Sequence, residues 1–288
     1  MDMFDLFREP EKNDNPDDSP TENGPPISAY SSTPETDISN PAAGLGGFET
    51  ETTLPPTSKS TVSDAVVLCV PGALVFRKHS FQLAWLSQLA RSVEELRAAN
   101  VNVAVVVGES NDAKSAAQAA RHLGVAPAEI EQTLRTSAQL HASMVLRLLA
   151  NAHPTTCQSV SDAVNLLQQN TIPVLLGASD SISTEGKAAM LAERVNGRYV
   201  LFSDLDIPKN TLTHSRFSRM AGEAAFKNNQ NFIVDPLTAM ILHRSKIESF
   251  LLSDKHVSKL TDVLTKGEAI GTWIVSGSTT QGPDLTEK

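Results

Sequence analysis

Residues 68–76 read LCVPGALVF, and the interpretation of the whole chain starts from this stretch. The run AVVLCV (65–70) is continuously apolar and rich in β-branched residues, which is typical of a strand covered on both faces. Proline and glycine then predict a tight turn that leads into a helix. A phosphate-binding turn in this place usually carries several glycines and a hydroxyl, because its backbone N–H groups hold the phosphate. Here the turn is Pro71, Gly72 and Ala73.

Downstream of this turn, apolar runs alternate with helical patterns. Further strands are expected at 101–108, 172–177, 198–206, 248–254 and 271–277. Helices are expected at 79–99, 111–123, 128–151, 161–170, 186–196, 235–247 and 256–267. This alternation predicts an α/β fold, a three-layer α/β/α sandwich with a mostly parallel central sheet. Ligands of such sheets bind at the carboxyl ends of the strands, so the candidate site comprises the turns at 70–75, 107–114, 177–187 and 203–210.

The first 60 residues differ in composition from the rest. They hold 9 of the 16 prolines, 12 Asp or Glu and only 3 Lys or Arg, whereas 61–288 has 21 of each charge sign. Such a segment cannot bury enough apolar surface to offset its chain entropy. We therefore predict a disordered acidic tail, 1–60, and one domain, 61–288. Within the tail, the apolar residues of MDMFDLF make 1–10 a candidate segment for binding a protein partner, or simply a frayed terminus.

Composition also argues against several classes of function. A domain without excess positive charge is a poor match for nucleic acid. Cys69 and Cys157 show no Cys-x-x-Cys spacing, so neither a disulfide framework nor a metal site is expected, which suits a reducing cytoplasm. The sequence has neither a secretory signal nor an apolar run of membrane-spanning length, so we expect a cytoplasmic protein without a membrane partner.

Six segments in order identify a resemblance: VPGALV, VVVGESNDAK, LLGASDSISTEGKAAMLAERV, LFSDLD, FIVDPLTAMILHRSKI and GEAIGTWI. Together they resemble the amino-acid kinase superfamily, and within it the archaeal type of UMP kinase, over roughly 64–276. STEGKAAMLAERV and VDPLTAMILHRSKI resemble the sequences that are typical of the family at these places, which are close to TTDAVAALLAEYV and DPLAAKIIERSGI. The resemblance implies the three-layer fold and phosphoryl transfer, which depends on N–H groups, lysines and metal placed around the phosphates.

The first two loops depart from the family pattern. Where the family has Gly-Gly-Ser, Pro71 has no N–H to donate, Ala73 has no hydroxyl, and only Gly72 remains. Where the family has Gly-Gly-Gly followed by a basic residue, this chain has Gly108, Glu109 and Ser110, with Lys114 further on. Glu109 brings negative charge beside the expected phosphates, which weakens anion binding unless it points outward or holds a metal. Lys114 is a candidate phosphate ligand or a solvent-facing helical lysine.

Two lysines common in the superfamily are also replaced. Cys69 stands at one of these positions, on the first strand, and Met240 stands at the other, in the helix after Asp235. A methionine at that point is expected to pack, and Asp235 is expected to cap the helix.

Other parts of the pattern are kept. Ser183-Thr184-Glu185 stands where the family has Thr-Thr-Asp, so the resemblance implies that Glu185 organises the catalytic cations and that the two hydroxyls bind phosphate; a plain helix cap is the alternative. Ser203 and Asp204 begin the segment that matches Thr-Asp-Val-Asp at the adenosine site. The binding residues implied in this way are Gly72, Gly108, Gly177, Ser183, Thr184, Ser203, Asp204, Asp206 and Lys209, and Glu185 and Lys114 are the catalytic candidates.

Two classes of function follow. The first is a UMP kinase, using ATP with Mg²⁺ and working with weakened loops. The second is a non-catalytic relative that binds a small anionic ligand or a protein partner. No metal site of the protein's own is expected. The resemblance also implies a homo-oligomer, a dimer or a hexamer of dimers, with the helix at 79–99 as a dimer surface.

We predict that the tail contributes nothing to folding. A chain that begins at Ser60 should keep the thermal midpoint of the full chain within about 2 °C, the shift that roughly half a kcal/mol produces in a domain of this size. Differential scanning calorimetry of the two chains measures this difference. A larger drop would mean that the tail packs on the domain.

Overall fold

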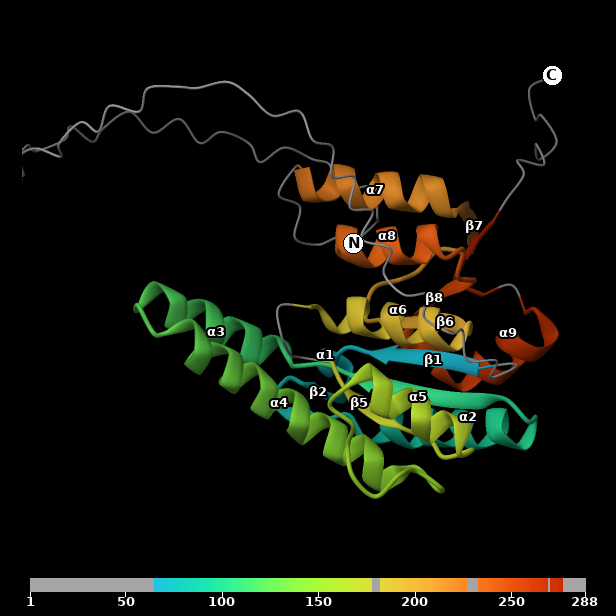
Figure 1. Ribbon diagram of the computed structural model, residues 1–288, viewed down its shortest axis with the longest axis horizontal. Coiled ribbons are helices and arrows are strands. Elements are labelled where there is room, and N and C mark those ends of the chain that lie inside the picture. Colours follow the sequence, from blue (N-terminus) through green and yellow to red (C-terminus); the bar gives the residue numbers. More distant parts are fainter. Residues whose placement is uncertain (1–64, 178–181, 227–232, 269, 277–288) are drawn as a thin grey trace, which may run out of the picture. The chain divides into compact units, whose positions relative to one another are not determined.

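The computed structural model describes residues 65–177, 182–226, 233–268 and 270–276 (Figure 1). The predicted tail, its boundary near residue 60 and the apolar island at its start lie outside these ranges. The described strands are β1 (Ala65–Val70), β2 (Phe76–Arg77), β3 (Ser80–Phe81), β4 (Asn102–Val107), β5 (Val174–Leu176), β6 (Arg198–Ser203), β7 (Asn210–Thr213), β8 (Ser249–Ser253) and β9 (Thr272–Val275). The described helices are α1 (Gly72–Val75), α2 (Leu83–Ala98), α3 (Asn111–His122), α4 (Pro127–Leu148), α5 (Val160–Gln168), α6 (Thr184–Val195), α7 (His214–Phe226), α8 (Pro236–Arg244), the 3-10 helix η2 (Asp254–Lys259) and α9 (Leu260–Lys266).

The main sheet has the order β5-β4-β1-β6-β8-β9-β7 within the described part of the chain. β5, β4, β1, β6 and β8 run parallel, β9 pairs antiparallel with β8, and β7 pairs parallel with β9. The prediction of a mostly parallel sheet is therefore confirmed. β1 lies between β4 and β6, and all six of its residues are buried.

Alternate residues of β1 enter two separate cores, one on each face of the sheet. Val66, Leu68 and Val70 pack with α2, α4 and α9, whereas Val67 and Cys69 pack with α5, α6, α7 and α8. Helices thus cover both faces, which confirms the three-layer sandwich. α3 buries only Ala117 and packs beside α4, and these two helices lie side by side in Figure 1.

The helix predicted at 79–99 begins later, at Leu83. Its first residues instead form a small hairpin in which β2 and β3 pair antiparallel, with Arg77 opposite Ser80. Lys78 and His79 form the turn with φ values of 53° and 60°, the left-handed conformation that a two-residue hairpin turn requires. A turn of this kind cannot continue into a helix, so the prediction was wrong for these residues.

The sequence also misses β7 and α7, for which no element was expected. β7 buries a single residue, Leu212, and α7 buries His214, Phe217, Ala221 and Ala224. Mostly small or polar buried residues give a weak periodic signal. Of the helices that the structure describes, none combines the length and the hydropathy that crossing a membrane needs.

We predict that the packing of β1 carries much of the stability. Leu68→Ala should lower the free energy of unfolding by about 2–5 kcal/mol, because its side chain is completely buried and its truncation leaves a cavity. Leu123→Ala is the matched control, since Leu123 is 82% exposed and its loss should change stability by less than about 0.5 kcal/mol. Urea denaturation of both variants gives the comparison, and equal losses would contradict the packing described.

Candidate functional site

The turns that follow β1, β4 and β5 lie in a row at one edge of the sheet. β1 and β4 are in register with Val70 opposite Val107. The amide of Gly108 donates to the carbonyl of Val70 at 3.0 Å, and the amide of Gly177 donates to the carbonyl of Val107 at 2.8 Å. The parallel ladder therefore continues into the turns and sets Gly72, Gly108 and Gly177 beside one another.

These glycines allow approaches that a side chain would prevent. A Cβ on Gly72 would lie 2.3 Å from the carbonyl oxygen of Gly108, so the first two turns are in backbone contact. A Cβ on Gly108 or on Gly177 would lie 2.5 Å from the hydroxyl oxygen of Thr184. Thr184 is thus held between two glycine turns at the start of α6.

Glu109 points inward, toward Thr184, and its side chain is only 15% exposed. The Thr184 hydroxyl donates to Oε2 of Glu109 at 3.3 Å, and the ammonium of Lys114 lies 3.4 Å from Oε1. The structure therefore joins two of the predicted phosphate ligands, Thr184 and Lys114, through a carboxylate of the chain itself.

The backbone around Glu109 is held from several sides. His141 of α4 donates from Nδ1 to the carbonyl of Gly108 at 3.1 Å, and the amide of Ser110 donates to the hydroxyl of Ser137 at 3.4 Å. Burial lowers the pKa of His141 despite its bond to Gly108, and its ring stacks on Phe76 of the hairpin. A neutral His141 with its proton on Nδ1 is consistent with these contacts. The sequence gives no sign of this role, because His141 reads as one residue of a long helix.

Ser183 and Asp235 act as linked helix caps. The Ser183 hydroxyl accepts from the amide of Gly186 at 2.9 Å and donates to Oδ2 of Asp235 at 2.5 Å. Asp235 accepts in turn from the amide of Thr238 at 2.9 Å, which confirms the predicted cap of α8. Burial alone would raise the pKa of Asp235, but the hydrogen bonds from Ser183 and Thr238 outweigh burial and lower it.

Glu185 lies one residue beyond Thr184, in the first turn of α6. Burial raises the pKa of its carboxyl group; its own backbone amide and Lys114 oppose this shift, whereas the negative charges of Glu109 and Asp235 add to it. Both predicted catalytic residues, Glu185 and Lys114, are thus close enough to influence each other.

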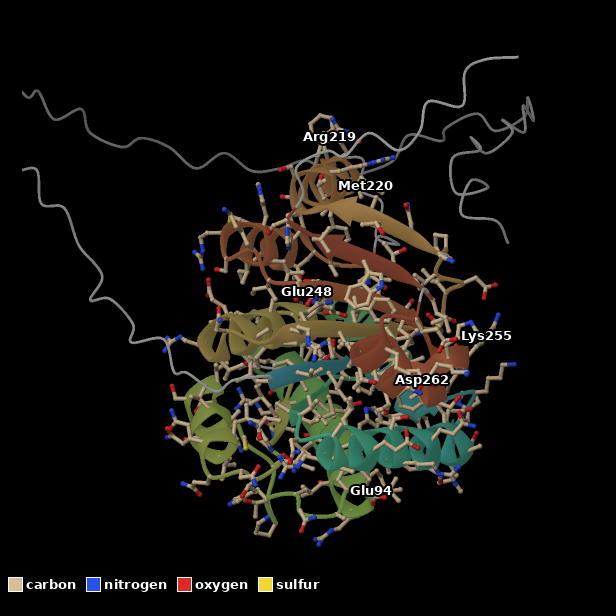
Figure 2. All side chains as sticks on the ribbon, turned by 90° about the vertical axis from the view of Figure 1, so that its right-hand side faces the viewer. Glu94, Arg219, Met220, Glu248, Lys255 and Asp262 are labelled. Carbon is tan, nitrogen blue, oxygen red and sulfur yellow. The ribbon has the colours of Figure 1, made fainter. Side chains whose placement is uncertain are left out.

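The other predicted ligands follow β6, on the opposite side of β1 from β4. Ser203 ends β6 as a buried residue, and its hydroxyl accepts from the amide of Leu205 at 3.1 Å. Asp204, Asp206 and Lys209 are exposed. Asp206 forms an ion pair of 2.5 Å with Lys255, which is labelled in Figure 2, and this hydrogen bond lowers the pKa of Asp206.

The two positions that carry lysines in the superfamily have different environments. Cys69 is completely buried in β1, and burial raises the pKa of its thiol. Met240 is 50% exposed, so the prediction that it packs was wrong. α8 buries Thr238, Ala239, Ile241 and Leu242, and Met240 lies on the exposed side of the same helix.

Lys187 is a buried lysine that the sequence analysis missed. It is 6% exposed, and its ammonium donates to the carbonyl of Leu176 at 3.0 Å, directly before Gly177. The family text quoted above has a valine at this place. A charged residue within the small, apolar run GKAAMLA was the available signal.

We predict that Asp235 makes the stability of the domain depend on acid pH. Because its pKa is lowered on folding, its contribution is complete above the unfolded value of about 3.9 and is lost as the pH falls through the folded value. Asp235→Asn should therefore lower the free energy of unfolding by about 1–2 kcal/mol at pH 7, and by less at about pH 3. Urea unfolding at both pH values tests this, with the more exposed Asp112→Asn as control. A pH-independent loss would contradict the expectation.

Comparison with known proteins gives a consistent set of relatives, although no family model matches the chain. The uridylate kinase of Sulfolobus acidocaldarius is 25% identical over 190 residues, 60% of this chain and 83% of that protein. The uridylate kinase of Archaeoglobus fulgidus is 24% identical over 223 residues, 73% of this chain and 99% of that protein.

Solved structures agree with these relatives. The crystal structure of the Archaeoglobus fulgidus uridylate kinase superposes with a TM-score of 0.62 at 22% identity, covering 73% of this chain and 99% of that one. The UMP kinase of Bacillus anthracis gives a TM-score of 0.58 at 13% identity, covering 75% and 97%. The chain is thus similar in sequence to archaeal uridylate kinases, and it shares the fold of the solved uridylate and UMP kinases.

Proposed function

We propose that this chain transfers a phosphoryl group from ATP to UMP, more slowly than kinases with complete glycine loops. The observation that supports this proposal is the row of glycine turns that closes on Thr184, with Lys114 and Glu185 beside it. The turns bring these groups together at the carboxyl edge of the sheet, where α/β folds bind their ligands.

The remaining groups fit parts of phosphoryl transfer. Lys114 supplies a positive charge, and the start of α6 favours an anion. Within the described residues there is no cluster of three or more His, Cys, Asp or Glu side chains suited to a metal. We expect an Mg²⁺ ion to arrive with ATP, since magnesium is usually held by one or two carboxylates together with the phosphates. Glu185 is the carboxylate that would hold it, and the ion would neutralise charge on the phosphates.

The ATP side is the weaker one. Pro71 uses its carbonyl to accept from the amide of Leu74 at 2.9 Å, which starts α1, but it has no N–H for a phosphate. Ala73 lacks a hydroxyl, and Met240 places an uncharged side chain on the exposed side of α8. Each loss removes a donor or a cation from the transferred phosphoryl.

A second candidate is a protein that binds a ligand without catalysis. The observation that favours it is the contact of Glu109 with Thr184 and Lys114, because this contact satisfies both groups in the absence of any ligand. An oligomer and a protein partner for residues 1–10 remain predictions under either proposal.

The test combines binding with repair. Separate calorimetric titrations should show weaker binding of Mg-ATP than of UMP. Restoring the family residues in the quadruple variant Pro71→Gly, Ala73→Ser, Glu109→Gly and Met240→Lys should raise the rate of ADP release with UMP by about 100-fold or more, the usual effect of one electrostatic donor. Single changes should have little effect on this rate at saturating nucleotide, since all four act on one phosphoryl group.

Thermal stability has to be compared first, because Pro71→Gly is expected to cost about 1 kcal/mol through the unfolded state. Ordinary kinase rates in the unmodified chain would contradict the weakening. A stable quadruple variant that binds both nucleotides and stays inactive would favour the non-catalytic candidate.

A further inference from the structure

Among the residues at this edge of the sheet, Glu109 is the one whose negative charge is least suited to binding phosphate. It lies two residues after the end of β4, and the backbone there is enclosed, since a Cβ on Gly72 would lie 2.4 Å from the carbonyl carbon of Glu109. His141 holds the carbonyl before it, and Ser110 after it caps α3. A backbone held in this way gives the side chain a restricted set of directions.

The carboxylate of Glu109 takes the place of an anionic ligand in its contacts. Oε2 accepts the Thr184 hydroxyl and Oε1 faces the ammonium of Lys114, and both are donors that could bind a phosphate oxygen. The Glu109 side chain is 15% exposed, whereas that of Lys114 is 52% exposed. The ion pair therefore joins a partly exposed lysine to a largely buried carboxylate.

A phosphate that approaches this edge meets two obstacles. It needs donors that Glu109 already occupies, and it brings negative charge close to a carboxylate that solvent screens only in part. Two further acidic groups, Glu185 and Asp235, lie near enough to act on one another, and Lys114 is the cation that acts on Glu185 from this side.

We propose that Glu109 fills the phosphate subsite of this edge as an internal carboxylate and so selects against ligands that place a phosphate there. The inference deepens the proposed function and rests on it only for the identity of the ligand. It names Glu109 as the residue that sets specificity, and it implies that the unmodified chain binds the uncharged part of a nucleoside better than its phosphate.

The test uses inorganic phosphate as the probe, with the full chain. Glu109→Gln keeps the size of the side chain and can still accept from Thr184, but it removes the charge. Isothermal titration should show phosphate affinity rising about tenfold or more, the change that roughly 1.4 kcal/mol produces. Adding Lys114→Met to this variant should abolish the gain, because the released ammonium is what the phosphate binds.

The matched control is Glu248→Gln. Glu248 is exposed beside the amino-terminal end of β8 and is labelled in Figure 2, so the variant removes one negative charge at the opposite edge of the sheet. It should leave phosphate affinity unchanged. Should Glu109→Gln fail to fold, Glu109→Gly serves in its place, since it restores the family residue. Folded Glu109 variants that bind phosphate no more tightly than the control overturn the proposal.

Parallel titrations with uridine and UMP separate this inference from the proposed function. Uridine affinity should be equal in the unmodified chain and in Glu109→Gln, whereas UMP affinity should rise. If phosphate affinity rises while neither UMP nor Mg-ATP binds, the proposed function fails and the role of Glu109 stands. If the unmodified chain binds UMP and phosphate as tightly as the variant does, the proposed function stands and the role of Glu109 fails.

Discussion

Backbone contact between the first two turns is the constraint on which the candidate site depends. Gly72 lies against the peptide that joins Gly108 to Glu109, at a separation that no Cβ could tolerate. This contact exists because β1 and β4 pair in register to their last residues. The register is secured by burial, since β1 contributes alternate side chains to two cores and a shift by one residue would exchange them. The packing of β1 in the two cores therefore fixes the positions of the turns that form the candidate site.

The fold could be predicted because its central strands are buried on both faces. Runs such as AVVLCV (65–70) and VNVAVVVG (101–108) carry no polar face, and parallel strands under two helical layers are the usual environment for them. What sequence could not supply were the short or half-polar elements. Lys78 and His79 adopt left-handed conformations in the hairpin turn, although neither is a glycine, so the sequence carries no signal for the turn. α7 buries small residues such as Ala221 and Ala224, whose burial leaves little trace in hydrophobic periodicity.

The sequence predicted which turns lie close together, but not the contacts that their side chains make. Gly108, Gly177 and Thr184 do lie together, as expected of turns at the carboxyl ends of neighbouring strands. The direction in which a side chain points could not be predicted, because it depends on neighbours that are distant in the sequence. Glu109 turns inward and Met240 outward, and neither direction follows from the local residues. Lys187 differs again, since its burial depends on how α6 packs on the sheet, mainly against β1, where its ammonium reaches the carbonyl of Leu176.

Charge decides which of the altered positions matters most. The proline at 71 removes a neutral donor, and a hydrogen bond to such a donor contributes about 1.5–3 kcal/mol when its partner is charged. Glu109 adds a full negative charge and also occupies the Thr184 and Lys114 donors. Both effects weaken the binding of a phosphate. At about 4 Å, two like charges near a protein surface repel by about 4 kcal/mol before salt screening. The inward carboxylate of Glu109 is therefore the physical feature that an account of this protein's ligand has to explain.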